Sequence, residues 1–227
     1  MPAGATPLVR VDGISKSYRS AAGETAVLEA TSFELPRGEI TSLTGTSGSG
    51  KSTLIALLAG LLEPDAGRIA FDEQDLTGLD EQARARLRAR SIGVVVQRGN
   101  LIPFLTAKEN VELAIEFADG ARGAVRAAEV LSKVGLARRL DHLPRRMSGG
   151  EAQRASVAMA LVNQPDLLLA DEVTGELDSA NAERVMEVIF DAWRGWGLTV
   201  LFVTHNSELA SRAHHQLRLA DGEVRRA

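Results

Sequence analysis

Residues 45–53 constrain the fold of this chain more than any other part of the sequence. They read Gly-Thr-Ser-Gly-Ser-Gly-Lys-Ser-Thr and meet every position of the pattern G-x-x-x-x-G-K-[ST]. In such a loop the glycines let the backbone curl so that successive N–H groups point inward, and the helix that follows adds the positive end of its dipole. The pattern therefore predicts a loop that holds phosphate groups.

The surroundings of the loop favour this interpretation over a chance match in an ordinary glycine-rich turn. Residues 39–44 read as a short strand and residues 54–62 as a buried helix, which is the required order of strand, loop and helix. We expect Lys51 to contact the β and γ phosphates and the Ser52 hydroxyl to bind Mg²⁺. The expected nucleotide-binding residues of the loop are Gly45, Thr46, Ser47, Gly48, Ser49, Gly50, Lys51, Ser52 and Thr53.

Length and composition limit the classes of protein that remain. With 227 residues the chain is long enough for one compact unit, and 44% hydrophobic and 25% charged residues are ordinary for a globular protein. The net charge of -4 argues against nucleic acid as the main partner, and the absence of cysteine excludes disulfides and thiolate metal sites. No secretory signal is visible, and the longest apolar run, residues 54–62, is about half of what a membrane span needs. We therefore expect any role at a membrane to depend on a partner.

Short apolar bursts before the loop predict antiparallel strands at residues 8–11, 26–28 and 32–35. Tyr18, the single tyrosine, falls in a polar stretch that reads as a loop, where it either packs at the rim or stacks on a base. Residues 79–90 look helical and carry arginines at steps of two. That spacing spreads charge around a helix, which favours a solvated face over a nucleic-acid patch.

The middle of the chain has the character of helices. Thr106 with Glu109 and Ser148 with Glu151 each form a capping-box pattern, which marks the start of a helix. Helices are predicted at residues 106–117, 122–134 and 148–163, the second ending at Gly135. We therefore expect a helical insert at about residues 98–163 in an otherwise α/β chain.

Polar residues follow three strands predicted at 91–96, 166–170 and 198–203, and the chain closes with a hairpin around residues 221–222. Gln97 ends the first of these strands, Asp171 and Glu172 the second, and His205 the third. In open α/β sheets ligands collect at the carboxyl ends of the strands. We expect Asp171 to hold Mg²⁺ and Glu172 to accept a proton from the water that attacks the γ-phosphate.

Gln97 and His205 are candidates to touch the attacking water, the metal or the γ-phosphate. The alternatives are structural: two carboxylates that cap the next helix, and a histidine that packs at a strand end.

These residues together resemble the ATP-binding cassette proteins, the motor subunits of ABC transporters, over about residues 8–224. The resemblance implies an α/β fold: a P-loop NTPase core with a mixed sheet, an N-terminal antiparallel β-subdomain and an inserted helical subdomain. It implies a single domain over 1–227, with the RecA-like core and β-subdomain at about 1–97 and 164–227 and the helical subdomain at about 98–163. The features that carry it are the loop at 45–53, Gln97, the signature-like Met147-Ser148-Gly149-Gly150-Glu151 with Gln153-Arg154, Asp171-Glu172, Glu176-Leu177-Asp178 and His205.

The resemblance also implies an assembly and roles for residues. Two cassettes would face each other head to tail, with each ATP between the loop of one copy and Ser148, Gly149 and Gly150 of the other. Tyr18 would stack on adenine, residues 176–178 would couple the two sites, and ATP with Mg²⁺ would be bound. The implied catalytic residues are Glu172, His205 and Gln97, and the implied metal ligands are Ser52, Gln97 and Asp171.

The sequence departs from the family pattern at four positions, which we expect to tune rate or coupling. Val173 and Thr46 stand where proline is usual, Glu151 where glutamine is common, and Met147 where leucine is usual.

Residues 97–111 look like the segment found in cassettes of the lipoprotein-releasing and macrolide-exporter type, which pair with permeases that carry a large extracytoplasmic domain. The protein would then lie at the cytoplasmic face of the membrane, held by its permease. Within this segment, four apolar side chains are either permease contacts or core of the helical lobe: Leu101, Ile102, Phe104 and Leu105.

The main hypothesis is thus an ATP-hydrolysing motor subunit for a membrane permease, of an exporter or mechanotransmission type. The alternatives are an importer cassette, a non-transport cassette in DNA repair or translation, and a small-molecule kinase. The last would leave residues 148–150 and His205 without a role. The sequence does not name the transported substrate.

Overall fold

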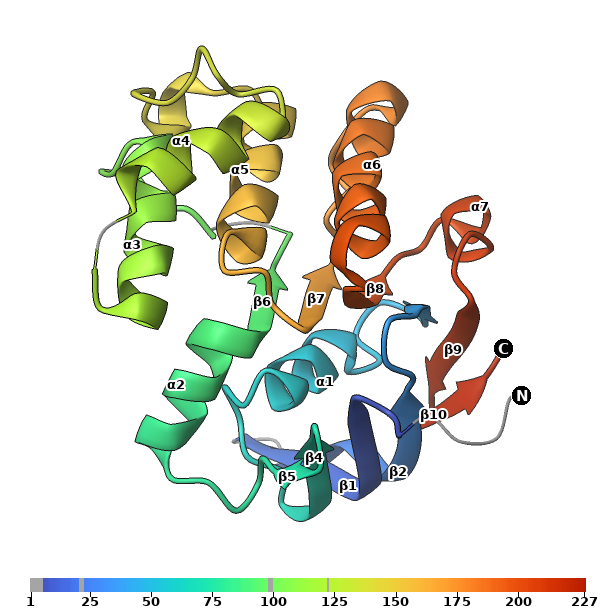
Figure 1. Cartoon of the computed structure of the whole chain (residues 1–227). Helices are drawn as coiled ribbons and strands as arrows, with labels where there is room; N and C mark the ends of the chain where they lie inside the picture. The colour runs from blue at the N-terminus through green and yellow to red at the C-terminus, as the bar shows by residue number, and fades with distance from the viewer. Residues whose placement is uncertain (1–5, 21–22, 98–99, 122) are drawn as a thin grey trace. The chain divides into compact units, whose positions relative to one another are not determined.

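The computed structural model describes residues 6–20, 23–97, 100–121 and 123–227 (Figure 1). The chain divides into two compact units. The first unit contains residues 1–85 and 199–227, and the second contains residues 86–198.

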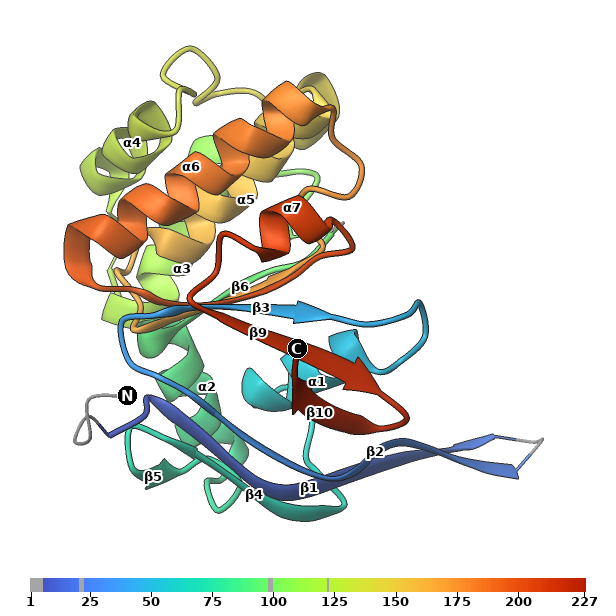
Figure 2. The same cartoon turned by 90° about the vertical axis from the view of Figure 1, so that its right-hand side faces the viewer.

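An antiparallel sheet with the strand order β2-β1-β4-β5 forms one layer of the first unit. Its strands are β1 (Val9–Ser20), β2 (Gly23–Leu35), β4 (Ala66–Phe71) and β5 (Gln74–Asp75). The first two make a long hairpin that extends beyond the rest of this sheet (Figure 2).

The prediction of a loop around Tyr18 was wrong, because β1 continues through it and Tyr18 pairs with Thr25 of β2. The two bursts at 26–28 and 32–35 are likewise parts of one strand. The register shifts between Val11 and Ile14 and again on either side of Lys16. Such bulges reset the inward and outward alternation, so the strict period of two that marks a strand is lost in the sequence.

A second sheet region of the first unit has the order β10-β9-β3-β8. It contains β3 (Ile40–Thr44), β8 (Thr199–Val203), β9 (His215–Ala220) and β10 (Glu223–Arg226). β3 runs parallel to both β8 and β9, and β9 and β10 form the predicted hairpin. All five residues of β8 are buried, which explains its almost continuous apolar sequence. The first four residues of β3 are buried as well, although Thr41 and Ser42 are polar.

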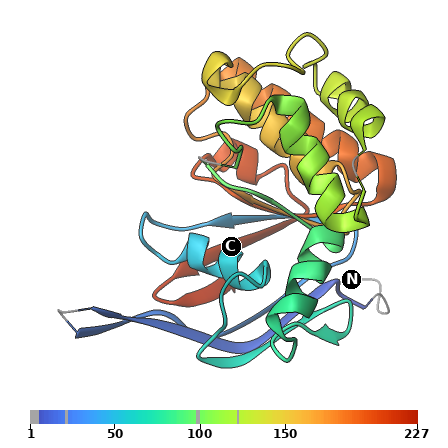
Figure 3. The same ribbon diagram turned by 90° about the vertical axis from the view of Figure 1, so that its left-hand side faces the viewer.

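Helix α1 (Lys51–Leu58) lies between β3 with β9 and the antiparallel sheet, as Figures 2 and 3 show from opposite sides. It begins earlier than predicted and ends at Leu58, because Gly60 takes a left-handed conformation with φ of 63°. The short α7 (Ser207–Ala210) follows β8. Buried side chains at the core of this unit include Ile14, Leu28, Leu35, Leu43, Leu54, Leu57 and Ile69.

Helix α2 (Glu81–Ser91) carries the predicted arginine series, and Arg84 does not fit the solvated face that we expected. Its side chain is 9% exposed and its guanidinium pairs with Glu63 at 2.5 Å and Glu81 at 3.1 Å. The hydrogen bond that Arg84 donates to Glu63 is the largest of the influences that raise the pKa of Arg84. The next arginine, Arg86, is exposed as predicted.

The second unit combines a parallel pair of strands with the helices. β6 (Ile92–Val95) pairs with β7 (Leu167–Asp171). The helices are α3 (Ala107–Asp119), α4 (Ala124–Lys133), α5 (Gly149–Leu161) and α6 (Ser179–Trp196), with a short 3-10 turn at Pro144–Arg146 before α5. Both predicted capping boxes are confirmed, at Thr106 and at Ser148. The predicted helical subdomain at 98–163 falls inside this unit.

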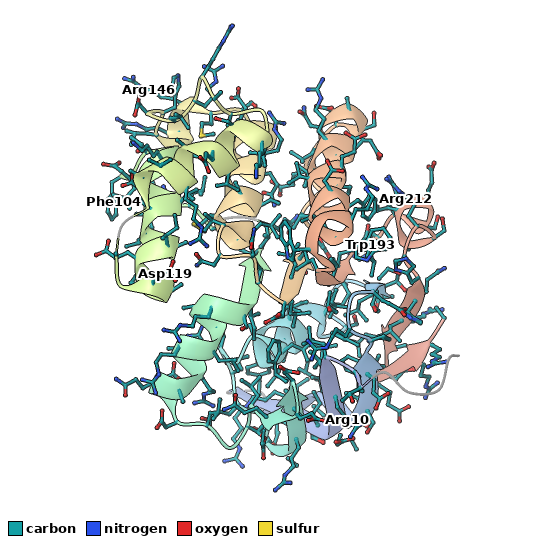
Figure 4. All side chains as sticks on the ribbon, in the orientation of Figure 1. Arg10, Phe104, Asp119, Arg146, Trp193 and Arg212 are labelled. Carbon is teal, nitrogen blue, oxygen red and sulfur yellow. The ribbon has the colours of Figure 1, made fainter. Side chains whose placement is uncertain are left out.

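The helices share an apolar core that draws on α3, α4 and α5, with Val111, Ile115, Leu131 and Ala158 among its members. Leu101 packs against this core, whereas the side chain of Phe104 is 77% exposed and is labelled beside α3 in Figure 4. In the part of the chain that the structure describes, no helix has both the length and the apolar character that a membrane crossing requires.

Candidate phosphate-binding site

The glycines of the loop allow it to pack against neighbouring strands more closely than any side chain would permit. Gly50 is the N-cap of α1 and has a φ of 100°, in the left-handed region. A Cβ atom on Gly50 would lie 2.6 Å from Cγ1 of Val27, and one on Gly45 would lie 2.5 Å from the carbonyl oxygen of Leu219. The loop is therefore clamped between β2 and β9 in a shape that requires glycine at both positions.

The side chain of Lys51 forms hydrogen bonds with the backbone of the loop. Its side chain is buried, and its ammonium donates hydrogen bonds to the carbonyls of Gly45 at 3.1 Å and Thr46 at 2.9 Å. This arrangement keeps a buried positive charge inside the curl of the loop. Next to it, the Ser49 hydroxyl is buried and has no hydrogen-bond partner among the residues that the structure describes, so it is available to a bound group.

The start of α1 adds to the positive character of the loop. The first N–H groups of a helix have no partner within the helix and carry the positive end of its dipole. The first turn of α1 contains no acidic residue, so no carboxylate of its own competes there for an anion. Ser52, on this turn, is exposed. The geometry can therefore hold phosphate oxygens, with a hydroxyl beside them.

Tyr18 lies beside the loop although it is distant in sequence. Its hydroxyl is 3.4 Å from the hydroxyl of Thr53, and the side chain is 42% exposed. The hairpin of β1 and β2 thus brings an exposed aromatic ring to the start of α1. The contact of Val27 with Gly50 was missed in the sequence. Its signal was an apolar residue within the polar end of the hairpin.

His205 emerges from the same edge of the sheet as the loop. β3 and β8 are parallel neighbours in which Leu43 pairs with Val203, so Gly45 and His205 each follow two residues later. The residues on either side of His205 are fixed: Thr204 is buried and donates its N–H to the carbonyl of Leu43, and Asn206 caps α7. The predicted histidine therefore has a defined place next to the loop.

The second unit repeats this arrangement with Gln97 and the two carboxylates. Val95 of β6 pairs with Ala170 of β7, and Gln97 and Glu172 each follow two residues later. The Asp171 side chain is buried at the end of β7.

The backbone at Glu172 departs from the strand. Its φ is 49°, a left-handed conformation that costs a residue with a Cβ roughly 1–3 kcal/mol and is concentrated at functional sites. The next residue, Val173, is buried. The turn is closed by the N–H of Gly175, which donates to the carbonyl of Glu172 at 3.0 Å. Asp171 and Glu172 thus differ in backbone conformation and burial.

Gln97 also faces the segment that follows the carboxylates. Its side-chain amide is 3.5 Å from a carboxylate oxygen of Glu176. Asp178, two residues on, is the N-cap of α6, and the N–H of Asn181 is the main reason that the pKa of Asp178 is lowered. The predicted coupling segment 176–178 therefore connects Gln97 with the start of α6.

The signature-like segment forms the start of α5 and packs on this same segment. Ser148 caps the helix by accepting the N–H of Glu151 at 3.2 Å. A Cβ on Gly150 would lie 2.8 Å from the amide group of Asn181, and one on Gly149 would lie 3.8 Å from Leu177. Gly150 is therefore required for close packing, and Asn181 is a site neighbour that the sequence did not reveal.

The structure thus brings the predicted residues together in groups. In the first unit the loop, Tyr18 and His205 lie together. In the second unit Gln97 lies beside the carboxylates, and residues 148–150 pack on residues 177–181. Hydroxyl, amide and carboxylate oxygens of this kind suit Mg²⁺, which prefers hard oxygen ligands. Among the described residues, no three His, Asp or Glu side chains gather into a metal site made by the protein alone.

Comparison with known proteins agrees with the family resemblance inferred from the sequence. A family model described as "ABC transporter" matches residues 28–175. The chain is 42% identical over 219 residues to an uncharacterized ABC transporter ATP-binding protein, YbbA, of Escherichia coli K12, with 96% of both chains covered. It is 41% identical over 221 residues to the lipoprotein-releasing system ATP-binding protein LolD 2 of Caulobacter vibrioides, again with 96% of both chains covered.

The fold also has a close counterpart among solved structures. A dimeric structure of the ATP-binding cassette MJ0796 in a post-hydrolysis state, bound to ADP and Pi, superposes with a TM-score of 0.90. The two sequences are 36% identical, and the match covers 96% of this chain and 97% of the other.

Proposed function

Because this chain belongs to the ABC transporter family and is an ATP-binding cassette with ATPase activity, we propose that the loop 45–53 binds the ATP whose hydrolysis drives a membrane permease. The observation that carries the proposal is the loop itself. Gly45 and Gly50 leave no space for a side chain. Lys51, the first residue of α1, donates hydrogen bonds back to carbonyls of the loop, so its buried positive charge lies within the loop. Each of these features is what a triphosphate needs.

The residues of the first unit bind the nucleotide in this proposal. Backbone N–H groups of the loop and of α1 hold the phosphates, and Lys51 exchanges its carbonyl partners for β and γ phosphate oxygens. The exposed ring of Tyr18 stacks on the adenine base, with its hydroxyl anchored near Thr53. His205 contacts the γ-phosphate or the attacking water from the neighbouring strand end.

The residues of the second unit carry out the chemistry. Glu172 accepts a proton from water as the water oxygen attacks the γ-phosphorus and ADP leaves. Its left-handed backbone aims the side chain differently from Asp171, which stays buried at the strand end. Gln97 orients the attacking water or binds the metal. The structural alternative, in which Asp171 and Glu172 cap the next helix, has less support because α6 already has Asp178 as its N-cap.

Mg²⁺ is the metal that fits this set of donors. Its site would use the Ser52 hydroxyl, Gln97 and Asp171, the last through water, and phosphate oxygens would complete the set. When bound, the ion neutralises charge that develops on the phosphates. The buried Ser49 hydroxyl, which has no hydrogen-bond partner among the described residues, is compatible with a site that is completed by the nucleotide.

Two copies of the chain would form a head-to-tail dimer with ATP between the loop of one copy and residues 148–150 of the other. Two observations support this. The start of α5 carries the positive end of a helix dipole, and its first residues, Ser148 and Gly149, are exposed. In addition, the similar cassette MJ0796 has been solved as a dimer with ADP and Pi. One copy alone would then be nearly inactive.

The partner would be an integral-membrane permease, which would hold the cassette at the cytoplasmic face of the membrane. LolD 2, at 41% identity, is named as part of a lipoprotein-releasing system. The exposed Phe104 in the segment after Gln97 (Figure 4) is the candidate permease contact. Leu101 instead packs against the core of the helices. An exporter or mechanotransmission system is therefore favoured over an importer or a cassette for DNA repair or translation.

Co-purification tests the permease, and nucleotide binding tests the loop. The tagged chain is expressed in its own cell, membranes are extracted gently, and the recovered proteins are identified. Recovery of a permease with a large extracytoplasmic domain supports the proposal, whereas recovery of ribosomes or DNA favours a non-transport cassette. In parallel, Lys51→Ala should weaken ATP binding, and an unchanged affinity would remove the loop from the site.

A further inference from the structure

The start of α5 has a feature that its proposed partner in the site, the start of α1, lacks. The first turn of α5 carries the acidic Glu151, whereas the first turn of α1 has no acidic residue. A carboxylate at a helix N-terminus favours the helix, but it cancels part of the positive field that would attract an anion. If α5 is to hold the γ-phosphate of a nucleotide, the charge of Glu151 must be offset.

The structure shows how this charge is occupied. One carboxylate oxygen of Glu151 accepts the backbone N–H of Ser148 at 2.9 Å, and the other accepts Nε of Arg139 at 2.8 Å. The Glu151 side chain is 20% exposed, so water screens the pair incompletely. The two bonds lower the pKa of Glu151, with the N–H of Ser148 as the larger cause, so the group is ionised at neutral pH.

Arg139 is the cation best placed to offset this charge. Its guanidinium also lies 3.2 Å from Nε2 of His142, which fixes its orientation in the loop before α5. Arg154, also on α5, is close enough for its charge to interact with Glu151, but its hydrogen bonds go to the carbonyl of Val134 and to Asn181. Arg146, labelled in Figure 4, is exposed at the end of the 3-10 turn. Among the described residues, Arg139 is the cation whose side chain forms an ion pair with Glu151, at 2.8 Å.

We propose that Arg139 is a positioning residue for the ATP-dependent dimer: it holds Glu151 in the capping box and neutralises it, so that α5 can accept a γ-phosphate from the opposite copy. This inference depends on the proposed function, in which Ser148, Gly149 and Gly150 contact that phosphate. It explains how a glutamate serves where the family commonly has glutamine. The carboxylate of Glu151 caps the helix, and the ion pair with Arg139 neutralises its charge.

The inference predicts a rescue that a purely structural role would not give. In a Glu172→Gln background, which should hold ATP without hydrolysis, dimer formation is measured by analytical ultracentrifugation with saturating ATP and Mg²⁺ at fixed salt. We expect Arg139→Ala to raise the dimer dissociation constant by at least about tenfold, because each of the two ATP sites then faces an unneutralised carboxylate. Adding Glu151→Gln should restore the constant to within about threefold of the reference.

Three controls accompany this series. Arg139→Lys keeps the charge and should retain most of the dimerisation. Arg138→Ala, at the exposed neighbouring position, should leave it unchanged. The affinity of the monomer for a fluorescent ATP analogue should be the same in all variants, because the loop 45–53 is untouched.

The outcomes distinguish a failure of the proposed ATP-dependent dimer from a failure of the role proposed for Arg139. If the Glu172→Gln reference does not dimerise with ATP, the sandwich is wrong and the role of Arg139 falls with it. If the reference dimerises and Arg139→Ala does so equally well, the inference alone is overturned. If the double variant is as impaired as Arg139→Ala, Arg139 acts by packing, which also overturns the charge argument.

Discussion

Leu43 and Val203 are register partners in the parallel pair of β3 and β8, and each lies two residues before a candidate site residue. The phosphate loop follows Leu43 at Gly45, and His205 follows Val203. In the second unit, Val95 and Ala170 have the same relationship to Gln97 and Glu172. Neighbouring parallel strands therefore deliver chemically different side chains at equal offsets, which is how an α/β sheet assembles a site from distant parts of a chain.

The first prediction concerns the proposed base. Glu172→Gln should retain ATP binding and lose turnover by roughly 10²- to 10⁴-fold, or about 3–5 kcal/mol in the barrier, because the amide cannot accept the proton of the attacking water. Phosphate release and binding of a fluorescent ATP analogue measure the two effects separately. Glu187→Gln, at an exposed position of α6, is the matched control. Near-normal hydrolysis by Glu172→Gln would assign the base elsewhere.

The second prediction concerns the close contact of the loop with β2. Gly50→Ala places a Cβ 2.6 Å from Val27 Cγ1 at a φ of 100°, so the loop must shift or strain. We expect a loss of stability of about 2 kcal/mol and a clear loss of ATP affinity. Gly120→Ala has a φ of 74° and nothing within 4 Å, so it should cost about 1 kcal/mol without affecting affinity. Urea unfolding and nucleotide titration check both, and equal affinities in the two variants would contradict the argument.

The third prediction concerns Ser148. Ser148→Arg should leave ATP binding by the monomer intact and weaken ATP-driven dimerisation by at least about tenfold, because a large cation then stands where the other copy must approach. Ser148→Ala is the comparison: it removes the cap at a cost of about 1 kcal/mol, together with the hydroxyl proposed to contact the phosphate, but adds no bulk, so its effect on dimerisation should be smaller. Size-exclusion chromatography of both variants with ATP gives the comparison. A dimer of unchanged stability in Ser148→Arg would argue against the sandwich.

The fourth prediction tests the buried cation of α2. Arg84→Ala removes a 9% exposed side chain that pairs with Glu63 and Glu81 and lies 3.6 Å from the position of a Cβ on Gly60. Because both carboxylates are exposed and screened, we expect a loss of about 1–2 kcal/mol, divided between packing and charge. Arg86→Ala should change stability by less than about 0.5 kcal/mol. Equal unfolding midpoints for the two variants would show that the Arg84 contacts contribute nothing.

The fifth prediction is a pH dependence. The pKa of Glu151 is lowered in the folded chain, so its bonds to Ser148 and Arg139 stabilise the protein above the unfolded value of about 4.3 and are lost as pH falls through the lower folded value. The stability difference between the natural chain and Glu151→Gln should therefore be constant above about pH 5 and shrink below about pH 4. Thermal unfolding at several pH values measures it. Parallel curves down to pH 3 would contradict it.

The elements that the sequence predicted well are those with local signals. The loop 45–53, the capping boxes at Thr106 and Ser148, and the buried strands at β7 and β8 each carry their information within a few residues. Capping geometry and continuous burial are decided locally, so the structure agrees with the sequence there.

The elements that were missed depend on distant partners. The hairpin around Tyr18 exists because β1 pairs with β2 across several bulges, and no short pattern marks that pairing. Arg84 is buried because Glu63, before the helix, reaches it. The contacts of Val27 with Gly50 and of Asn181 with Gly150 join residues far apart in the chain. Such contacts are set by tertiary packing, which a single sequence read by its local patterns does not contain.

The strand order of the first unit has a consequence for the synthesis of the protein. β3, which leads into the phosphate loop, lies between β8 and β9, and both of these strands come from the last part of the chain. While a ribosome is still translating the middle of the chain, β3 has neither of its hydrogen-bonding neighbours. The phosphate loop can thus take its packed form only when translation is nearly complete, and a nascent chain cut short before β8 would leave β3 with two unpaired edges.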